Sequence, residues 1–167
     1  MNTAALQLTS RADIEAEIAT LRQAGRHIVP VRWQDQPAWL KLSVPQPPAW
    51  RYQLLAGMAR LLQHPAMQPV RPHGGATGIR NEARRLVSLA DAGLRVPQLL
   101  AYDDHWLLIS DIGHTTLEML LRRSEAETQM EHWQRGAGYI LQAHRARQYL
   151  SQAFARNLVW SPEHGFG

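Results

Sequence analysis

Two strand-turn-strand patterns constrain the fold of this chain more than any other sequence feature. Residues 27–33 (HIVPVRW) and 38–42 (AWLKL) are rich in β-branched and aromatic side chains and flank the turn residues 35–37 (DQP). Residues 98–102 (QLLAY) and 105–110 (HWLLIS) form a second pair around two consecutive aspartates. Each pattern predicts a β-hairpin, because two strands joined by so short a turn must run antiparallel.

Helical periodicity surrounds both hairpins. The apolar spacing predicts helices over residues 10–25, 50–62, 79–92, 116–122 and 124–144. Ser10 with Asp13, and Ser124 with Glu127, have the spacing of helix capping boxes. Residues 64–78 are rich in proline and glycine and predict a loop. For the last helix, one buried face is predicted, formed by Met130, Trp133, Ala137, Ile140, Leu141 and His144.

The order of these elements indicates the fold class. Antiparallel hairpins followed by a mainly helical segment predict an α+β fold with two lobes and an antiparallel sheet in the first of them. We expect the first lobe to span residues 1–110 and the second, which begins with a hinge and is an incomplete helical lobe, to span residues 111–167. The second lobe closes with a strand within residues 153–160 and the start of a partner strand at 166–167.

Composition and charge exclude several classes of protein. With 45% hydrophobic residues the chain can bury a core, and it contains no apolar run long enough for a transmembrane segment and no signal-peptide pattern. The absence of cysteine excludes disulfides and thiolate metal sites and fits the cytoplasmic location that we expect. The net charge of +4 favours an anionic partner. The arginines are dispersed, so the nucleic-acid signal is weak, and nucleic-acid binding stays a minor alternative.

Lys41 is the only lysine among 18 basic residues. It lies in the second arm of the first predicted hairpin, while Glu82 lies at the border of the apolar face of the helix predicted over residues 79–92. Lys41 alone is explained equally well as a lysine that occurs by chance, and a lone border glutamate such as Glu82 is more often a solvated residue. A strand lysine held by a helix glutamate, however, presents a fixed positive charge to phosphate oxygens. The prediction of a phosphate site therefore depends on the pair.

The order and spacing of these motifs resemble the protein-kinase-like phosphotransferases. Residues 38–41 (AWLK) are similar to the strand lysine motif of that superfamily, 81–86 (NEARRL) to its helix glutamate, and 107–113 (LLISDIG) to its hinge strand and linker. Residues 143–144 (AH) resemble the end of the long helix before the catalytic loop, which 157–160 (NLVW) would close. Within the superfamily, the chain looks most like small bacterial lipopolysaccharide-core and Kdo kinases.

The resemblance implies an ATP-dependent phosphotransferase. In it, Lys41 would bind the α/β phosphates, Glu82 would orient Lys41, and the hinge with Asp111 and Gly113 would hold adenine. Asn157 would hold Mg²⁺ against the nucleotide phosphates. The phosphate acceptor would be a sugar hydroxyl of a lipid-linked glycan, a small molecule or a protein.

Three departures from the superfamily pattern affect this prediction. Gln152 stands at the position of the catalytic aspartate, and glutamine can orient an acceptor hydroxyl but cannot accept its proton. No glycine-rich hairpin precedes the strand lysine; residues 74–78 (GGATG) follow it instead, as a flexible connection or an anion-binding helix start. The metal-binding aspartate is missing, and residues 165–167 (GFG) do not supply it. We therefore expect a truncated or degenerate kinase fold with weak or no phosphoryl transfer by this chain alone.

Other functions find less support. A pseudokinase that binds nucleotide or a protein partner without chemistry is the main alternative to an active kinase, and Gln152 favours it. The eight histidines lack helical zinc spacing. Ser110, Asp111 and His114 lack the nucleophile elbow of a hydrolase.

Overall fold

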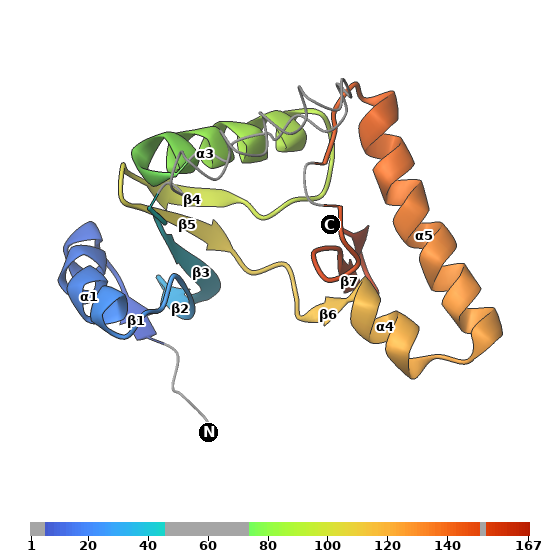
Figure 1. The fold of residues 1–167 in the computed structure, drawn as a ribbon, viewed down its shortest axis with the longest axis horizontal. Helices are drawn as coiled ribbons and strands as arrows, with labels where there is room; N and C mark the ends of the chain where they lie inside the picture. The colour runs from blue at the N-terminus through green and yellow to red at the C-terminus, as the bar shows by residue number, and fades with distance from the viewer. Residues whose placement is uncertain (1–5, 46–73, 151–152) are drawn as a thin grey trace, which may run out of the picture.

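The computed structural model describes residues 6–45, 74–150 and 153–167 (Figure 1). In these ranges the chain forms four helices, a five-stranded sheet and a three-stranded sheet, which confirms the α+β class. The strands are β1 (Leu6–Leu8), β2 (Ile28–Trp33), β3 (Gln36–Leu42), β4 (Leu99–Tyr102), β5 (Trp106–Ser110), β6 (Thr115–Thr116), β7 (Val159–Ser161) and β8 (Gly165–Phe166). The helices are α1 (Arg11–Gln23), α3 (Gly75–Asp91), α4 (Leu117–Arg123) and α5 (Ala126–Arg145). The helix predicted over residues 50–62 lies outside the described residues.

The five-stranded sheet has the strand order β1-β2-β3-β5-β4. Both predicted hairpins, β2–β3 and β4–β5, are present and antiparallel. The predicted antiparallel sheet is instead mixed, because β1 pairs parallel with β2, Leu6 lying opposite Val31. The helix α1 connects these strands and returns the chain to the same end of the sheet, so β2 runs in the direction of β1. The first hairpin turns at Gln34 and Asp35, which have φ angles of 48° and 66°, one residue earlier than predicted.

The start of α1 is fixed by its predicted capping box. The Asp13 carboxylate accepts hydrogen bonds from the Thr9 and Ser10 amides, both at 2.8 Å, and the Ser10 hydroxyl accepts one from the Asp13 amide at 3.3 Å. The backbone hydrogen bonds from Thr9 and Ser10 lower the pKa of Asp13 from 3.8 to about 2. The helix is followed by Gly25, whose φ of 65° suits a residue without a side chain.

The five-stranded sheet has a different helix on each face (Figure 1). Leu40 of β3 is fully buried on the face covered by α1, where it belongs to the same core as Ile14. Leu107 of β5 is fully buried on the opposite face, where it packs with Ile79 and Ala83 of α3. Successive residues of a strand point to opposite faces, so the side chains that flank Leu40 along β3 face α3.

The helix α3 begins at Gly75, four residues earlier than predicted. The segment 75–78 forms its first turn, so the prediction of a loop through Gly78 is wrong for these residues. Glycine, alanine and threonine carry little apolar signal, and the hydrophobic period therefore starts only at Ile79. The beginning of α3 packs on the sheet, whereas Leu89 near its end belongs to a second core. The helix α3 thus packs both on the five-stranded sheet and in the second core.

The helix α4 is present as predicted. The Thr116 hydroxyl caps it by accepting a hydrogen bond from the Met119 amide at 3.2 Å. The capping box predicted from Ser124 and Glu127 is wrong. The residue before α5 is Glu125, and its side chain makes no capping hydrogen bond.

The buried face predicted for α5 is wrong for most of its residues, although Ile140 packs against the buried core of this region as predicted. Met130 and Trp133 are 56% and 57% exposed, whereas Gly136, Tyr139 and Ala143 are buried. A Cβ atom added to Gly136 would lie only 2.7 Å from a leucine methyl group of α4. The close approach of α4 therefore selects the face of α5 that carries a glycine, which a hydrophobic pattern does not reveal.

The strands β6, β7 and β8 form the antiparallel three-stranded sheet. The strand β7 confirms the strand predicted within residues 153–160, and β8 is the predicted partner strand. The second core consists of Leu89, Leu94, Leu117, Tyr139, Ala143, Leu158 and Phe166. Because Leu89 and Leu94 precede position 110, residues 111–167 do not build this core alone.

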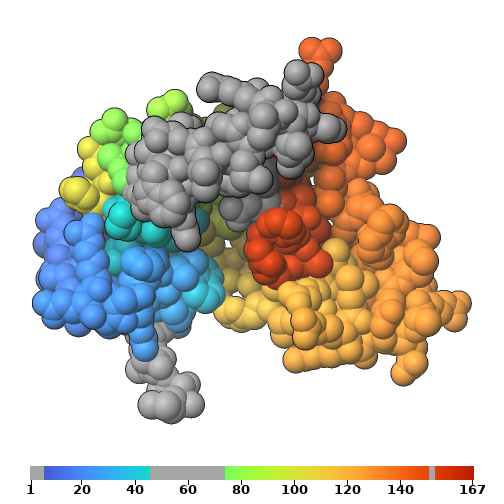
Figure 2. Space-filling model, in the orientation of Figure 1, coloured from blue at the N-terminus to red at the C-terminus, as the bar shows by residue number. Residues whose placement is uncertain are grey.

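The space-filling view shows where the N-terminal strands and the C-terminal helices lie relative to one another (Figure 2). Residues 6–45, in blue to cyan, and the helices α4 and α5, in orange, occupy opposite sides of the face shown. None of the helices in the described ranges is both long and apolar enough to cross a membrane.

Candidate functional site

Strand alternation and helix packing bring Lys41 and Glu82 together. Lys41 lies opposite Leu107 in the β3–β5 pairing, and cross-strand partners share a face of the sheet. Leu107 packs against Ala83 of α3, which is adjacent to Glu82 in sequence. Lys41 Nζ reaches Glu82 Oε1 and forms a hydrogen-bonded ion pair with it. The pairing predicted from the sequence is confirmed.

The Lys41–Glu82 pair is partly open to solvent. The two side chains are 38% and 36% exposed. An ion pair with this exposure contributes at most about 1 kcal/mol to stability. Its main effect is therefore to fix the position of the ammonium group. That group has three N–H donors, so a ligand can approach it while the bond to Glu82 persists.

Asp111 and Gly113 form the connection that follows β5. The Asp111 carboxylate is only 10% exposed and lies 3.2 Å from His114 Nε2. It also accepts a hydrogen bond from the Gly113 amide at 2.8 Å, while the Asp111 amide donates to the Pro37 carbonyl at 3.1 Å. Gly113 has a φ of 124°, which favours glycine. Both residues thus define the shape of the connection through contacts within the protein.

Asn157 lies in the turn before β7. Its backbone amide donates a hydrogen bond to the Phe154 carbonyl at 2.8 Å. It lines a cavity of about 180 Å³ between α3, α5 and the C-terminal sheet, and this lining includes neither Lys41 nor Glu82. Gln152 lies outside the described residues.

Asn157 does not make a magnesium site together with the other described residues. Within the described ranges no group of three or more histidine, aspartate and glutamate side chains is arranged to hold a metal ion. Mg²⁺ is usually bound by one or two carboxylates together with substrate phosphates. The described residues that line the cavity at Asn157 include no aspartate or glutamate. The donor set therefore does not fit Mg²⁺.

Arg95 is a residue of the site region that the sequence did not single out. Its Nη2 donates a hydrogen bond to the Ile112 carbonyl at 2.6 Å, and its Nη1 donates to the carbonyls of Val159 at 3.2 Å and Gly165 at 2.9 Å. The Tyr139 hydroxyl donates to the Arg95 carbonyl at 2.7 Å. Arg95 thus joins the connection after β5 to the C-terminal sheet. No sequence signal distinguishes it among 17 dispersed arginines, the total of 18 basic residues less Lys41.

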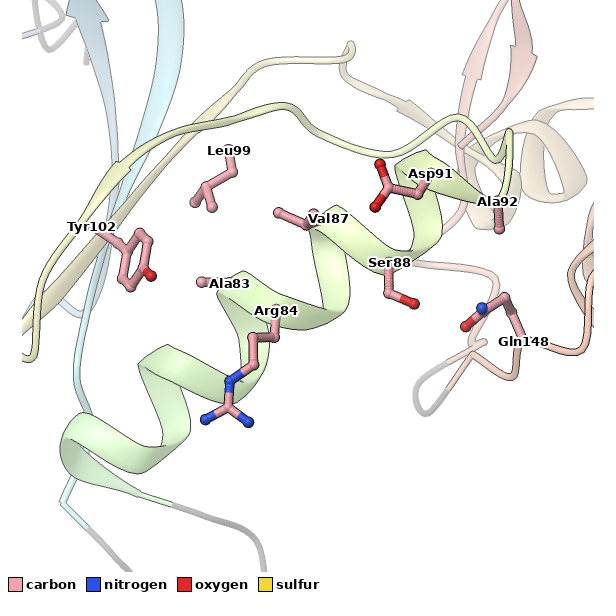
Figure 3. Close-up of a pocket in the computed structure, with 9 residues that line it drawn as sticks. All are labelled: Ala83, Arg84, Val87, Ser88, Asp91, Ala92, Leu99, Tyr102 and Gln148. Carbon is pink, nitrogen blue, oxygen red and sulfur yellow. The ribbon is translucent and has the colours of Figure 1, made fainter.

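A larger cavity of about 730 Å³ lies beside another part of α3 (Figure 3). Val87, Leu99 and Tyr102 line its apolar end between α3 and β4, and Ser88 and Asp91 line its other end. The residues of the ion pair do not line it. Position 91 falls on the side of a helix opposite to position 82, with positions 83 and 87 in between, so this cavity is centred away from the candidate site.

Comparison with known proteins gives no match. No protein-family model matches the chain, and no curated protein or solved structure is significantly similar to it.

Proposed function

We propose that this chain binds ATP as part of an ATP-dependent phosphotransferase of protein-kinase-like fold. The observation that carries the proposal is the ion pair between Lys41 of β3 and Glu82 of α3. In protein kinases, a strand lysine held by a helix glutamate binds the nucleotide phosphates. The Lys41 ammonium has the same support here, and it is accessible to a ligand. The proposed phosphate acceptor is a sugar hydroxyl of a lipid-linked glycan, a small molecule or a protein.

The connection after β5 is the proposed contact for adenine. The amides of Ser110, Asp111 and Gly113 already donate to acceptors within the protein. The Ile112 carbonyl accepts a hydrogen bond from Arg95. We therefore assign the adenine contact to the Ile112 amide, with Asp111 and Gly113 fixing the backbone around it.

A second candidate function is nucleotide binding without phosphoryl transfer. Two observations favour it: no aspartate or glutamate is among the described residues that line the cavity at Asn157, and glutamine stands at position 152. Phosphoryl transfer depends on positioning and on neutralisation of charge, which metal ions normally provide. We expect ATP binding by this chain and little or no ADP formation.

Calorimetric titration of ATP into wild type, Lys41→Met and Arg32→Met tests the proposal. Arg32 is a strand cation on β2 that donates to the Asp35 carbonyl and serves as the matched control. Loss of a charged hydrogen bond to phosphate weakens binding by at least about tenfold, which corresponds to about 1.4 kcal/mol. We expect this loss for Lys41→Met and no change for Arg32→Met.

Two outcomes decide between the alternatives. Equal ATP affinity in wild type and Lys41→Met would exclude the proposed phosphate site. ADP formation that disappears in Lys41→Met would identify an active enzyme, whereas ATP binding without ADP formation would identify the inactive nucleotide-binding module.

A further inference from the structure

The helix α5 lies at one edge of the molecule (Figure 1) and carries an exposed apolar stripe. Met130, Trp133 and Leu141 are each roughly half exposed, and Ala137 lies between them. These four positions fall within about 80° of one another around the helix, on a different side from the face that packs on α4. The stripe is therefore a second apolar face of α5, and an apolar face of this kind indicates an interaction surface.

Charged residues of opposite sign lie beside the two ends of the apolar stripe. Glu127 and Glu131 lie in the first two turns of α5, and Arg145 lies in its last turn. All three fall on the same side of the stripe, about 60–100° around the helix from Met130. Neither Glu127 nor Arg145 forms an ion pair with another of the described residues. Both charges are thus available to a partner that covers the stripe.

The stripe is complementary to a second copy of itself that lies antiparallel to it. Trp133 and Leu141 lie four residues on either side of Ala137, so a two-fold axis at Ala137 places the tryptophan of one copy beside the leucine of the other. The same axis brings Glu127 of one copy to within about 3 Å, along the helix, of Arg145 of the other, and on the same side of the interface. The small side chain at the axis lets the two helices approach closely. A parallel arrangement would instead place like charges side by side.

We propose that α5 is the interface of a homodimer, in which two copies of the apolar stripe pack antiparallel about a two-fold axis at Ala137. The dimer covers the stripe of both copies and pairs Glu127 with Arg145 at each end. A bilayer surface fits this face less well, because carboxylates border the stripe and anionic lipids repel them. The interface is independent of the proposed ATP site, since Lys41 and Glu82 lie on β3 and α3.

Sedimentation equilibrium of the full chain across the micromolar range tests for the dimer. The variant is Leu141→Gln, and the matched control is Val87→Gln on α3, because these two apolar side chains are 48% and 46% exposed. We expect wild type and Val87→Gln to dimerise with the same Kd. In Leu141→Gln the Kd rises at least about tenfold, because apolar contact is lost at two symmetric places.

Charge reversal tests the pairing at the two ends of the stripe. Glu127→Arg and Arg145→Glu should each weaken the dimer, because each brings like charges together at both ends. The double variant, which carries both reversals, should dimerise more tightly than either single variant. A double variant that is no tighter than the single variants would overturn the proposed pairing.

A single introduced cysteine reports the orientation, because the chain contains none of its own. At the proposed axis, two copies of Ala137→Cys lie close enough for a disulfide, which needs Cα atoms within about 7 Å. Two copies of Met130→Cys lie about 20 Å apart along the helices and should not cross-link.

Three results would overturn the proposal. The first is a monomer at every concentration, including one that binds to vesicles of phosphatidylcholine and phosphatidylglycerol, which would identify a lipid surface as the occupant. The second is a dimer with equal Kd values for wild type and Leu141→Gln. The third is cross-linking of Met130→Cys but not of Ala137→Cys.

Discussion

Replacing Arg95 with methionine should destabilise the protein by about 3 kcal/mol. Methionine keeps much of the aliphatic stem but removes three hydrogen bonds from a charged group to backbone carbonyls. The Val159 carbonyl keeps a second donor, the Gly167 amide at 2.9 Å, so the loss falls mainly on the carbonyls of Ile112 and Gly165. At about 1.5 kcal/mol for each of these two charged hydrogen bonds, the sum is about 3 kcal/mol. For a chain of this size, that loss lowers Tm by roughly 6–12 °C.

Urea unfolding followed by circular dichroism measures this effect. Arg84→Met is the control, because Arg84 is an exposed arginine on α3, and its replacement should change the free energy of unfolding by less than about 0.5 kcal/mol. If Arg95→Met were as stable as Arg84→Met, the bonds from Arg95 would not hold the connection after β5, and our account of that connection would be refuted.

Two further predictions concern stability. Gly138→Ala should stabilise α5 by about 0.5–1 kcal/mol, because alanine favours helix and its Cβ meets nothing within 4 Å. Gly136→Ala should be less stable than Gly138→Ala by about 1–2 kcal/mol, because its Cβ would lie 2.7 Å from Leu117 Cδ2; equal stabilities in urea would contradict this packing. The pKa of Asp13 is lowered to about 2 in the folded protein, so its contribution to stability is present above about pH 4 and is lost as pH falls toward 2. Asp13→Asn should therefore flatten the dependence of Tm on pH in that window, and an unchanged slope would contradict the capping geometry.

Local patterns in the sequence predicted most of the described elements before position 110, including both hairpins. Strand alternation and the helix border were enough to predict that Lys41 meets Glu82, because both patterns fix which way a side chain points. The parallel pairing of β1 was not predictable in the same way. Its three residues are too few to show a period, and its partner lies beyond a whole helix.

The packing of α5 and the connection after β5 depended more on tertiary contacts than on local patterns. The face of α5 that is buried was set by the fit of Gly136 against α4, and apolar residues such as Met130 were left exposed. Asp111 was predicted as part of a hinge, but its hydrogen bond to the Gly113 amide comes from local turn geometry. Arg95 acts through three carbonyls that are distant in sequence, so no local pattern marks it.

Labelling by an acyl phosphate of ATP tests the central claim most directly, because the chain has a single lysine. A lysine amine held at the nucleotide phosphates attacks the acyl carbonyl, forms an amide and releases ATP. Mass spectrometry should find Lys41 acylated much faster than the α-amino group of the chain, and excess ATP should suppress the labelling of Lys41 alone. Acylation of Lys41 that is no faster than that of the α-amino group, and that ATP does not reduce, would contradict the account.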